Sequence, residues 1–203
     1  MMQKIINEER KREARRNVEN YIREGLLKIK NEEIKKFVDF FLINAEKSLT
    51  TANLLMDVSL NKNLKEQLKL HENFETYLWV TVTAYYSMFY SALALLANDG
   101  IRIGDKIKHK VVSDSLVHFF IENKKLSILL ADYEKTKNDA LEIVGNEEYN
   151  KQAEKLVQDF EFEMVKRGRV QYEIGETAIE NKARTSLGRA KIFMLETKKI
   201  LKK

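Results

Sequence analysis

The 203-residue sequence contains no cysteine and no proline, and it has only seven glycines. Without cysteine the chain forms no disulfide, uses no thiolate nucleophile and binds no zinc or iron–sulfur cluster through sulfur. Proline and glycine are the residues least compatible with helix interiors. Their scarcity, together with 33% charged and 44% hydrophobic residues, favours an all-α protein over one built on sheets. We therefore expect a single all-α domain over residues 1–203.

Targeting signals and long apolar runs are also missing. The N-terminal sequence MMQKIINEERKREARR has no apolar segment of the kind that a secretory signal requires. Only residues 77–98 approach the length of a membrane span, and their tyrosines, threonines and serines indicate a buried helix instead. We expect a cytoplasmic protein that does not enter a membrane.

Several motifs of catalysis and cofactor binding are absent. The sequence has no nucleophile elbow, no phosphate-binding glycine loop and no dinucleotide fingerprint. Its three histidines, at positions 71, 109 and 118, form no two-histidine zinc motif. We expect no metal site and no cofactor. We place His71 on the surface and His118 against packed neighbours. His109 begins a helix among lysines, where it could cap the helix, order the preceding loop or face a phosphate.

The most apolar stretch of the chain covers residues 73–100. Two neighbouring stripes at helical spacing leave little polar surface on it, so we expect a helix enclosed by several others. Asn73 is the expected N-cap, and Gly100 lies where a left-handed residue is expected to end the helix. Further helices are expected over residues 3–27, 32–59, 109–122, 125–144, 147–168 and 177–201. Together they predict an antiparallel up-and-down bundle of about four core helices with additional helices.

The first 30 residues carry most of the excess positive charge. They contain nine lysines and arginines against five glutamates, so their net charge is 9 − 5 = +4, against +5 for the whole chain. The expected helix in residues 1–30 has only a thin apolar stripe, which suggests a peripheral position. It could contact nucleic acid or an acidic partner, or it could be a solvated helix with internal Glu–Arg pairs.

A second basic cluster lies near a predicted helix end in residues 160–175. It contains Lys166, Arg167 and Arg169, and Tyr172 follows closely. Cations beside aromatic rings at a helix end suit a phosphate or a stacked base. The same residues also suit an ordinary helix end, where basic side chains interact favourably with the helix dipole.

Three stretches carry a family resemblance. They are NAEKSLTTANLLMDVS, AYYSMFYSALALLANDG, and KIKHKVVSDSLVHFF with His109. Together they resemble the HEPN superfamily of small helical proteins, in the branch with a YYxMFYxAxALL helix. The resemblance covers roughly residues 35–125 and 160–200. It implies a HEPN-like bundle that forms a homodimer.

The resemblance also implies a site. In HEPN ribonucleases an arginine holds the scissile phosphate, and a histidine four to six residues later assists metal-independent attack by the ribose 2′-hydroxyl. Arg167 occupies the arginine position and Tyr172 the histidine position. A tyrosine with a pKa near 10 is a poor general base at neutral pH, which weakens the expectation of endoribonuclease activity. Lys166, Arg169 and His109 are further candidates for phosphate binding.

These features lead to two functional expectations, and a purely structural helical scaffold with no ligand is a third alternative. In the first, the protein binds RNA or nucleotide phosphate and is the toxin-like component of a toxin–antitoxin pair. Its partner then resembles a minimal nucleotidyltransferase. In the second, the chain is a non-catalytic helical protein–protein interaction module in which Arg167 and Tyr172 serve an interface. RNA cleavage that requires Arg167 would distinguish the first from the second.

Overall fold

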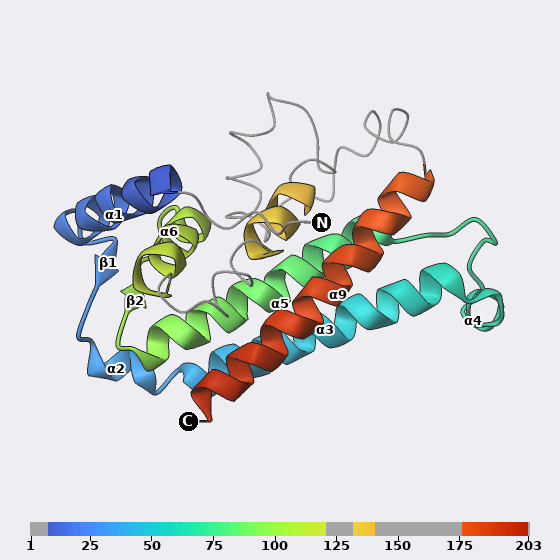
Figure 1. Cartoon of the computed structure of the whole chain (residues 1–203). Coiled ribbons are helices and arrows are strands. Elements are labelled where there is room, and N and C mark those ends of the chain that lie inside the picture. Colours follow the sequence, from blue (N-terminus) through green and yellow to red (C-terminus); the bar gives the residue numbers. More distant parts are fainter. Residues whose placement is uncertain (1–7, 121–131, 141–175, 203) are drawn as a thin grey trace.

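The computed structural model describes residues 8–120, 132–140 and 176–202, and the expected all-α fold is confirmed (Figure 1). The described elements follow in chain order: α1 (Glu8–Arg23), β1 (Leu27–Lys28), α2 (Glu32–Lys35), α3 (Val38–Leu60), α4 (Lys62–Gln67), α5 (Tyr77–Asn98), β2 (Arg102–Ile103), α6 (Lys108–Phe120) and α9 (Glu176–Leu201). Residues 132–140 form a further helical stretch. The helix expected over 147–168 lies outside the described residues.

Three long helices, α3, α5 and α9, form the centre of the bundle (Figure 1). The Tyr77 hydroxyl donates to Glu180 Oε2 at 3.2 Å, which joins the first turn of α5 to the start of α9. These two helices therefore run in the same direction. Lys198 near the end of α9 pairs with Glu46 near the start of α3, so α3 runs the opposite way.

Helix α5 is the most enclosed element, as its apolar sequence predicts. Fifteen of its 22 residues are buried. Its length and composition would suit a membrane span, but 83% of its apolar 18-residue segment is buried inside the protein. The expected N-cap was wrong, because the helix begins after Thr76 rather than after Asn73, and Thr76 makes no side-chain cap bond. Gly100 does adopt the expected left-handed conformation, with a φ of +71°.

The helix expected over residues 32–59 is divided in two. Asn31 caps its start as expected, and its Oδ1 accepts a hydrogen bond from the Ile34 amide at 3.1 Å. Short-range bonds from the amides of Lys36 and Phe37 then end α2 after one turn. A new helix, α3, begins at Val38. The connector expected after it also contains a helix, α4, capped by the Asn61 side chain.

The N-terminal helix packs against α6 rather than lying free (Figure 1). Its buried residues are Ala14, Val18 and Tyr21, whereas Ile22 is 40% exposed. The chain leaves α1 through Gly25 at a φ of +74°. It then forms a short antiparallel ribbon, in which Leu27 pairs with Ile103 and Lys28 with Arg102. The sequence pattern did not predict this ribbon, because each strand has only two residues.

Candidate functional site

The predicted site residues are only partly covered by the structure. Lys166, Arg167, Arg169 and Tyr172 lie outside the described residues. His109 is described, as the second residue of α6. The candidate site is therefore built from His109 outward.

His109 packs against the aromatic face of α5, in a group that we call the histidine–tyrosine cluster: Tyr85, Tyr86, Phe89, His109 and Tyr133. The imidazole stacks on the Phe89 ring with centroids 4.1 Å apart and planes at 26°. Its Nδ1 atom forms a hydrogen bond with the Tyr85 hydroxyl at 2.7 Å. The Tyr85 hydroxyl also lies 3.3 Å from that of Tyr133. A chain of three polar groups thus leads from half-buried His109 into the core.

The phenols of this cluster are not proton acceptors at neutral pH. Burial raises the pKa of Tyr85 well above its ordinary value, and the hydrogen-bonded Tyr133 hydroxyl adds to the effect. Burial likewise raises the pKa of Tyr133 far above 10, and that of Tyr86 to about 12. All three keep their protons, so they orient the imidazole by hydrogen bonding and ring contact.

A second buried group lies between α1, α6 and the 132–140 helix, and we call it the Asp114 network: Arg10, Asn17, Tyr21, Asp114 and Glu134. Asp114 is 2% exposed. Its Oδ1 accepts from Arg10 Nη1 at 2.6 Å, and its Oδ2 accepts from Asn17 Nδ2 at 3.0 Å and from the Tyr21 hydroxyl at 2.8 Å. The Arg10 Nη2 atom also reaches Glu134 at 3.0 Å.

The surroundings of the Asp114 network shift the pKa values of Glu134 and Tyr21. Burial by itself would raise the pKa of Glu134, but the Ser113 hydroxyl and the Arg10 guanidinium outweigh it, and the net shift is downward. Burial and the bond to Asp114 raise the pKa of Tyr21 far above its ordinary value. These groups hold α1 against α6 by hydrogen bonds, and we assign them a structural role. The sequence did contain a signal for the network, an aspartate within the apolar run VVSDSLV.

The other two histidines, His71 and His118, also lie among the described residues. His71 is exposed, as expected. His118 is half-buried and contacts the Phe119 ring edge-on, with centroids 4.7 Å apart. Burial lowers its pKa, and Arg15 adds to the effect. Across residues 8–120, 132–140 and 176–202, no group of three or more histidine and carboxylate side chains is arranged to hold a metal ion.

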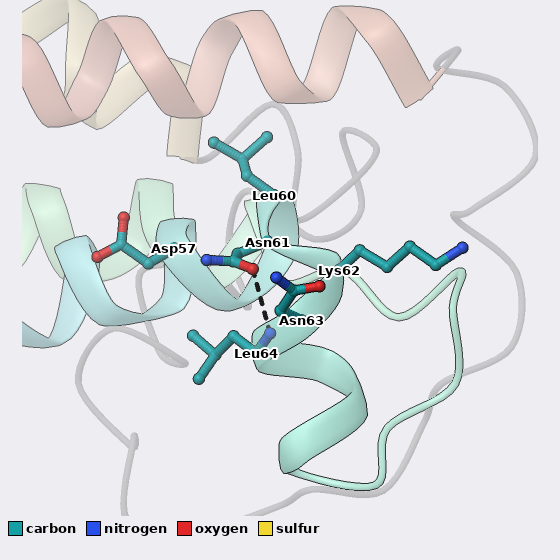
Figure 2. Close-up of a pocket in the computed structure, with 6 residues that line it drawn as sticks. All are labelled: Asp57, Leu60, Asn61, Lys62, Asn63 and Leu64. Atoms are coloured by element: carbon teal, nitrogen blue, oxygen red, sulfur yellow. Dashed lines mark hydrogen bonds between the residues drawn. The ribbon is translucent and has the colours of Figure 1, made fainter.

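A shallow depression lies at the corner between α3 and α4 (Figure 2). Its volume is about 590 Å³, and its lining includes Asp57, Asn61 and Lys62. Figure 2 shows Lys62 pointing away from Asp57, and Asn61 is engaged in capping α4. This depression therefore brings no pair of chemical groups together.

No protein-family model, no curated protein and no solved structure matches this chain.

Proposed function

We propose that this protein is a HEPN-like helical bundle that binds RNA or nucleotide phosphate. The observation that supports the proposal best is the histidine–tyrosine cluster. Tyr85 and Phe89 belong to the YYSMFY stretch, and His109 lies 24 residues beyond Tyr85. The two stretches that carry much of the resemblance thus pack against each other through the residues that define them.

In this proposal Arg167 is the principal phosphate ligand, and Lys166 and Arg169 add positive charge beside it. His109 holds the start of α6 against α5 and contributes to phosphate binding from there. Tyr172 stands where a ribonuclease of this type has histidine, so we expect RNA binding with little or no cleavage. Any cleavage would be metal-independent endoribonuclease activity.

We also propose where the protein acts and with which partner. The protein acts in the cytoplasm as a homodimer and as the toxin-like component of a pair. Its partner is a minimal nucleotidyltransferase that acts as antitoxin. Expression of this chain alone should slow the growth of a bacterial host, and co-expression with such a partner should restore it. An unchanged growth rate on expression alone would count against the toxin role.

The decisive experiment measures RNA binding and RNA cleavage separately, in EDTA, for the wild type and for Arg167→Ala and Tyr172→Phe. We expect the wild type to bind structured RNA and Arg167→Ala to bind it at least tenfold more weakly, because a charge-assisted contact to phosphate is lost. Lys191→Ala, which removes an exposed lysine from α9, is the matched charge control. Equal affinities for the wild type and Arg167→Ala would refute the assigned site.

The cleavage assay has three informative outcomes. Cleavage by the wild type that is lost in Arg167→Ala would make the protein a ribonuclease despite its tyrosine. Loss of cleavage in Tyr172→Phe as well would show that the phenol takes part. Binding without cleavage at high protein concentration would support a binding protein that has lost the reaction.

A second candidate function is that of a non-catalytic protein–protein interaction module. It is favoured by the outer face of α3, where Ile43 is 49% exposed and Leu54 56% exposed. The two residues are eleven positions apart, close to three turns of about 3.6 residues each, so they project from the same side of the helix. Exposed aliphatic side chains aligned in this way suit a helix-packing interface.

The interaction module and the homodimer can be tested together by light scattering after gel filtration. We expect the double variant Ile43→Glu, Leu54→Glu to be monomeric where the wild type is a dimer, because two buried charges would oppose the interface. Leu68→Glu, which alters a leucine that is 52% exposed beside α4, is the matched control and should remain dimeric. A dimer in the double variant would exclude this face.

A further inference from the structure

An apolar groove lies between the start of α3 and the β2–α6 connection. Its volume is about 400 Å³. Its apolar lining includes Phe37, Phe40, Phe41 and Leu93, and charged side chains of both signs, among them Arg102 and Lys108, also line it. Phe37 is 49% exposed and Phe40 56% exposed, although large aromatic side chains are usually the first to be buried. The two rings meet edge to face with centroids 6.5 Å apart, which leaves ring faces open to a ligand.

The charged side chains beside this groove differ in whether they form ion pairs. Glu33 is paired with Lys36 at 2.7 Å, and Asp105 with Lys108 at 3.0 Å. Arg102 is exposed and makes no ion pair or side-chain hydrogen bond with any residue that the structure describes. The acidic groups at the groove are therefore neutralised locally, and a cation remains.

Next to Arg102 lies a second cation, Lys28, which forms no ion pair within the part of the chain that the structure describes. The ribbon places Lys28 directly opposite Arg102, and its other pair, Leu27 and Ile103, is buried on the inner face. Because side chains alternate along a strand, Lys28 and Arg102 project together from the outer face. Like charges directly opposite on neighbouring strands destabilise the pairing. A bound anion would remove this repulsion.

We propose that this groove, which we call the Phe40–Arg102 groove, binds single-stranded RNA. The Phe37 and Phe40 rings stack with bases, and Arg102 and Lys28 contact the flanking phosphates. Binding of this kind combines aromatic platforms with cations that follow the backbone. The proposal deepens the proposed function, on which it rests for the nature of the ligand, and it adds a contact surface separate in sequence from Arg167.

Other occupants match only part of the groove. An acidic polypeptide would satisfy the two cations and leave the exposed rings without a matching group. An apolar helix would cover the rings and bury Arg102 beside them without a counter-charge, which is costly. A single strand of RNA offers planar bases and phosphates in alternation, and it therefore matches both features at once.

The test is fluorescence anisotropy with a labelled, unstructured RNA decamer over a range of KCl concentrations. We expect Phe40→Ala to weaken binding by about 5- to 150-fold without changing the salt dependence, because one stacked base is lost. Arg102→Ala and Lys28→Ala should each weaken binding and reduce the slope of log K against log salt by about 0.7. Phe74→Ala, at a phenylalanine that is 37% exposed and does not line the groove, and Lys191→Ala are the matched controls.

Competition identifies the form of the ligand. Unlabelled decamer should displace the probe, whereas AMP or polyglutamate at the same concentration of negative charge should not. Displacement by AMP at that concentration would mean that the ligand is a free nucleotide and not a strand. Displacement by polyglutamate would mean that the ligand is an acidic polypeptide and not RNA. Either result overturns the proposal.

Crosslinking gives a measurement that does not depend on how well a variant folds. A decamer that contains 5-iodouridine should crosslink to Phe37 or Phe40 in the wild type, as mapped by mass spectrometry. Crosslinks elsewhere only, with groove variants at wild-type affinity and Arg167→Ala weakened, would refute the groove and leave the proposed function intact. No RNA binding by the wild type would refute both.

Discussion

At the scale of single residues, Asp114 does the most to connect separate parts of the chain. One carboxylate, 2% exposed, accepts hydrogen bonds from Arg10, Asn17 and Tyr21. All three donors come from α1, which Asp114 thereby joins to α6. A buried charge is tolerated only when its partners are in place, so each donor matters more than an exposed one would.

We expect Asp114→Asn to lower the free energy of unfolding by about 2 kcal/mol, because the charge-assisted bonds to Arg10 and Tyr21 are weakened. Tyr21→Phe removes one hydroxyl and should cost about 1 kcal/mol. Urea unfolding followed by circular dichroism measures both. Asp105→Asn is the control, since Asp105 pairs with Lys108 at a fully exposed position and should change stability by less than about 0.5 kcal/mol. An effect of Asp114→Asn no larger than the control would contradict the role of this carboxylate.

Glu134 makes the same network sensitive to acid. Its pKa lies below the ordinary value of 4.5 because the Ser113 hydroxyl and Arg10 outweigh the effect of burial. A carboxyl with a lowered pKa in the folded state binds fewer protons than it does when unfolded. Its contribution to stability is therefore present above about pH 4.5 and is lost as the pH falls through the folded pKa.

We expect Glu134→Gln to be less stable than the wild type at pH 7, by about 1 to 2 kcal/mol, and to approach it near pH 3. Thermal unfolding at half-unit steps from pH 3 to pH 7 would show the two stability curves converging as the pH falls. A constant difference over the whole range would mean that the carboxylate charge of Glu134 contributes nothing.

At the scale of elements, the sequence predicted the helices whose apolar side chains recur at helical spacing over many residues. Helix α5 was placed within a few residues because its apolar side chains cover most of its circumference, and α9 begins at residue 176, one position before the expected start. The division between α2 and α3 and the helix α4 were not predicted. Both depend on short hydrogen bonds and on an asparagine cap within polar sequence, where periodicity carries no signal.

Two glycines give opposite predictions for the same substitution. Gly100 ends the α5 segment with a φ of +71°, and a Cβ there would lie 3.4 Å from the Asn31 amide nitrogen. Gly100→Ala should therefore lower the free energy of unfolding by about 1 to 2 kcal/mol. Gly188 is inside α9, and an added Cβ would meet nothing within 4 Å. Gly188→Ala should raise stability by about 0.5 to 1 kcal/mol. Chemical denaturation of the two variants checks the pair, and a shift of the same sign in both would refute the argument from backbone conformation.

At the scale of the whole molecule, the sequence indicated the all-α bundle, but of the histidine–tyrosine cluster it singled out only His109. The resemblance rested on the YYSMFY stretch and on His109, and it did not predict that they pack against each other. It could not reveal the Asp114 network, since Arg10 and Asp114 are 104 residues apart and no local pattern joins them. Tyr133 was missed for the same reason, because its neighbour Tyr85 is 48 positions away. Contacts of this kind depend on how the helices cross and not on the spacing within any one of them.

Within residues 8–120, 132–140 and 176–202, two groups of helices are held together differently. Helices α3, α5 and α9 share an apolar core, and α5 alone buries fifteen residues. Helix α1 buries only three, and the Asp114 network supplies the rest of its attachment to α6. Because polar networks depend on protonation and apolar contacts do not, α1 should open before the core does, and more readily in acid.

Hydrogen exchange measured by mass spectrometry, corrected for the intrinsic effect of pH, tests this order of opening. We expect the α1 amides to be less protected than those of α5 at pH 7, and the difference to grow at pH 3, where the stability curves of Glu134→Gln and the wild type are expected to meet. Asp114→Asn should lower protection in α1 at both pH values and leave that of α5 nearly unchanged. Asp105→Asn, the exposed control, should alter neither helix. Equal protection in α1 and α5 would instead mean that the Asp114 network makes them one cooperative unit.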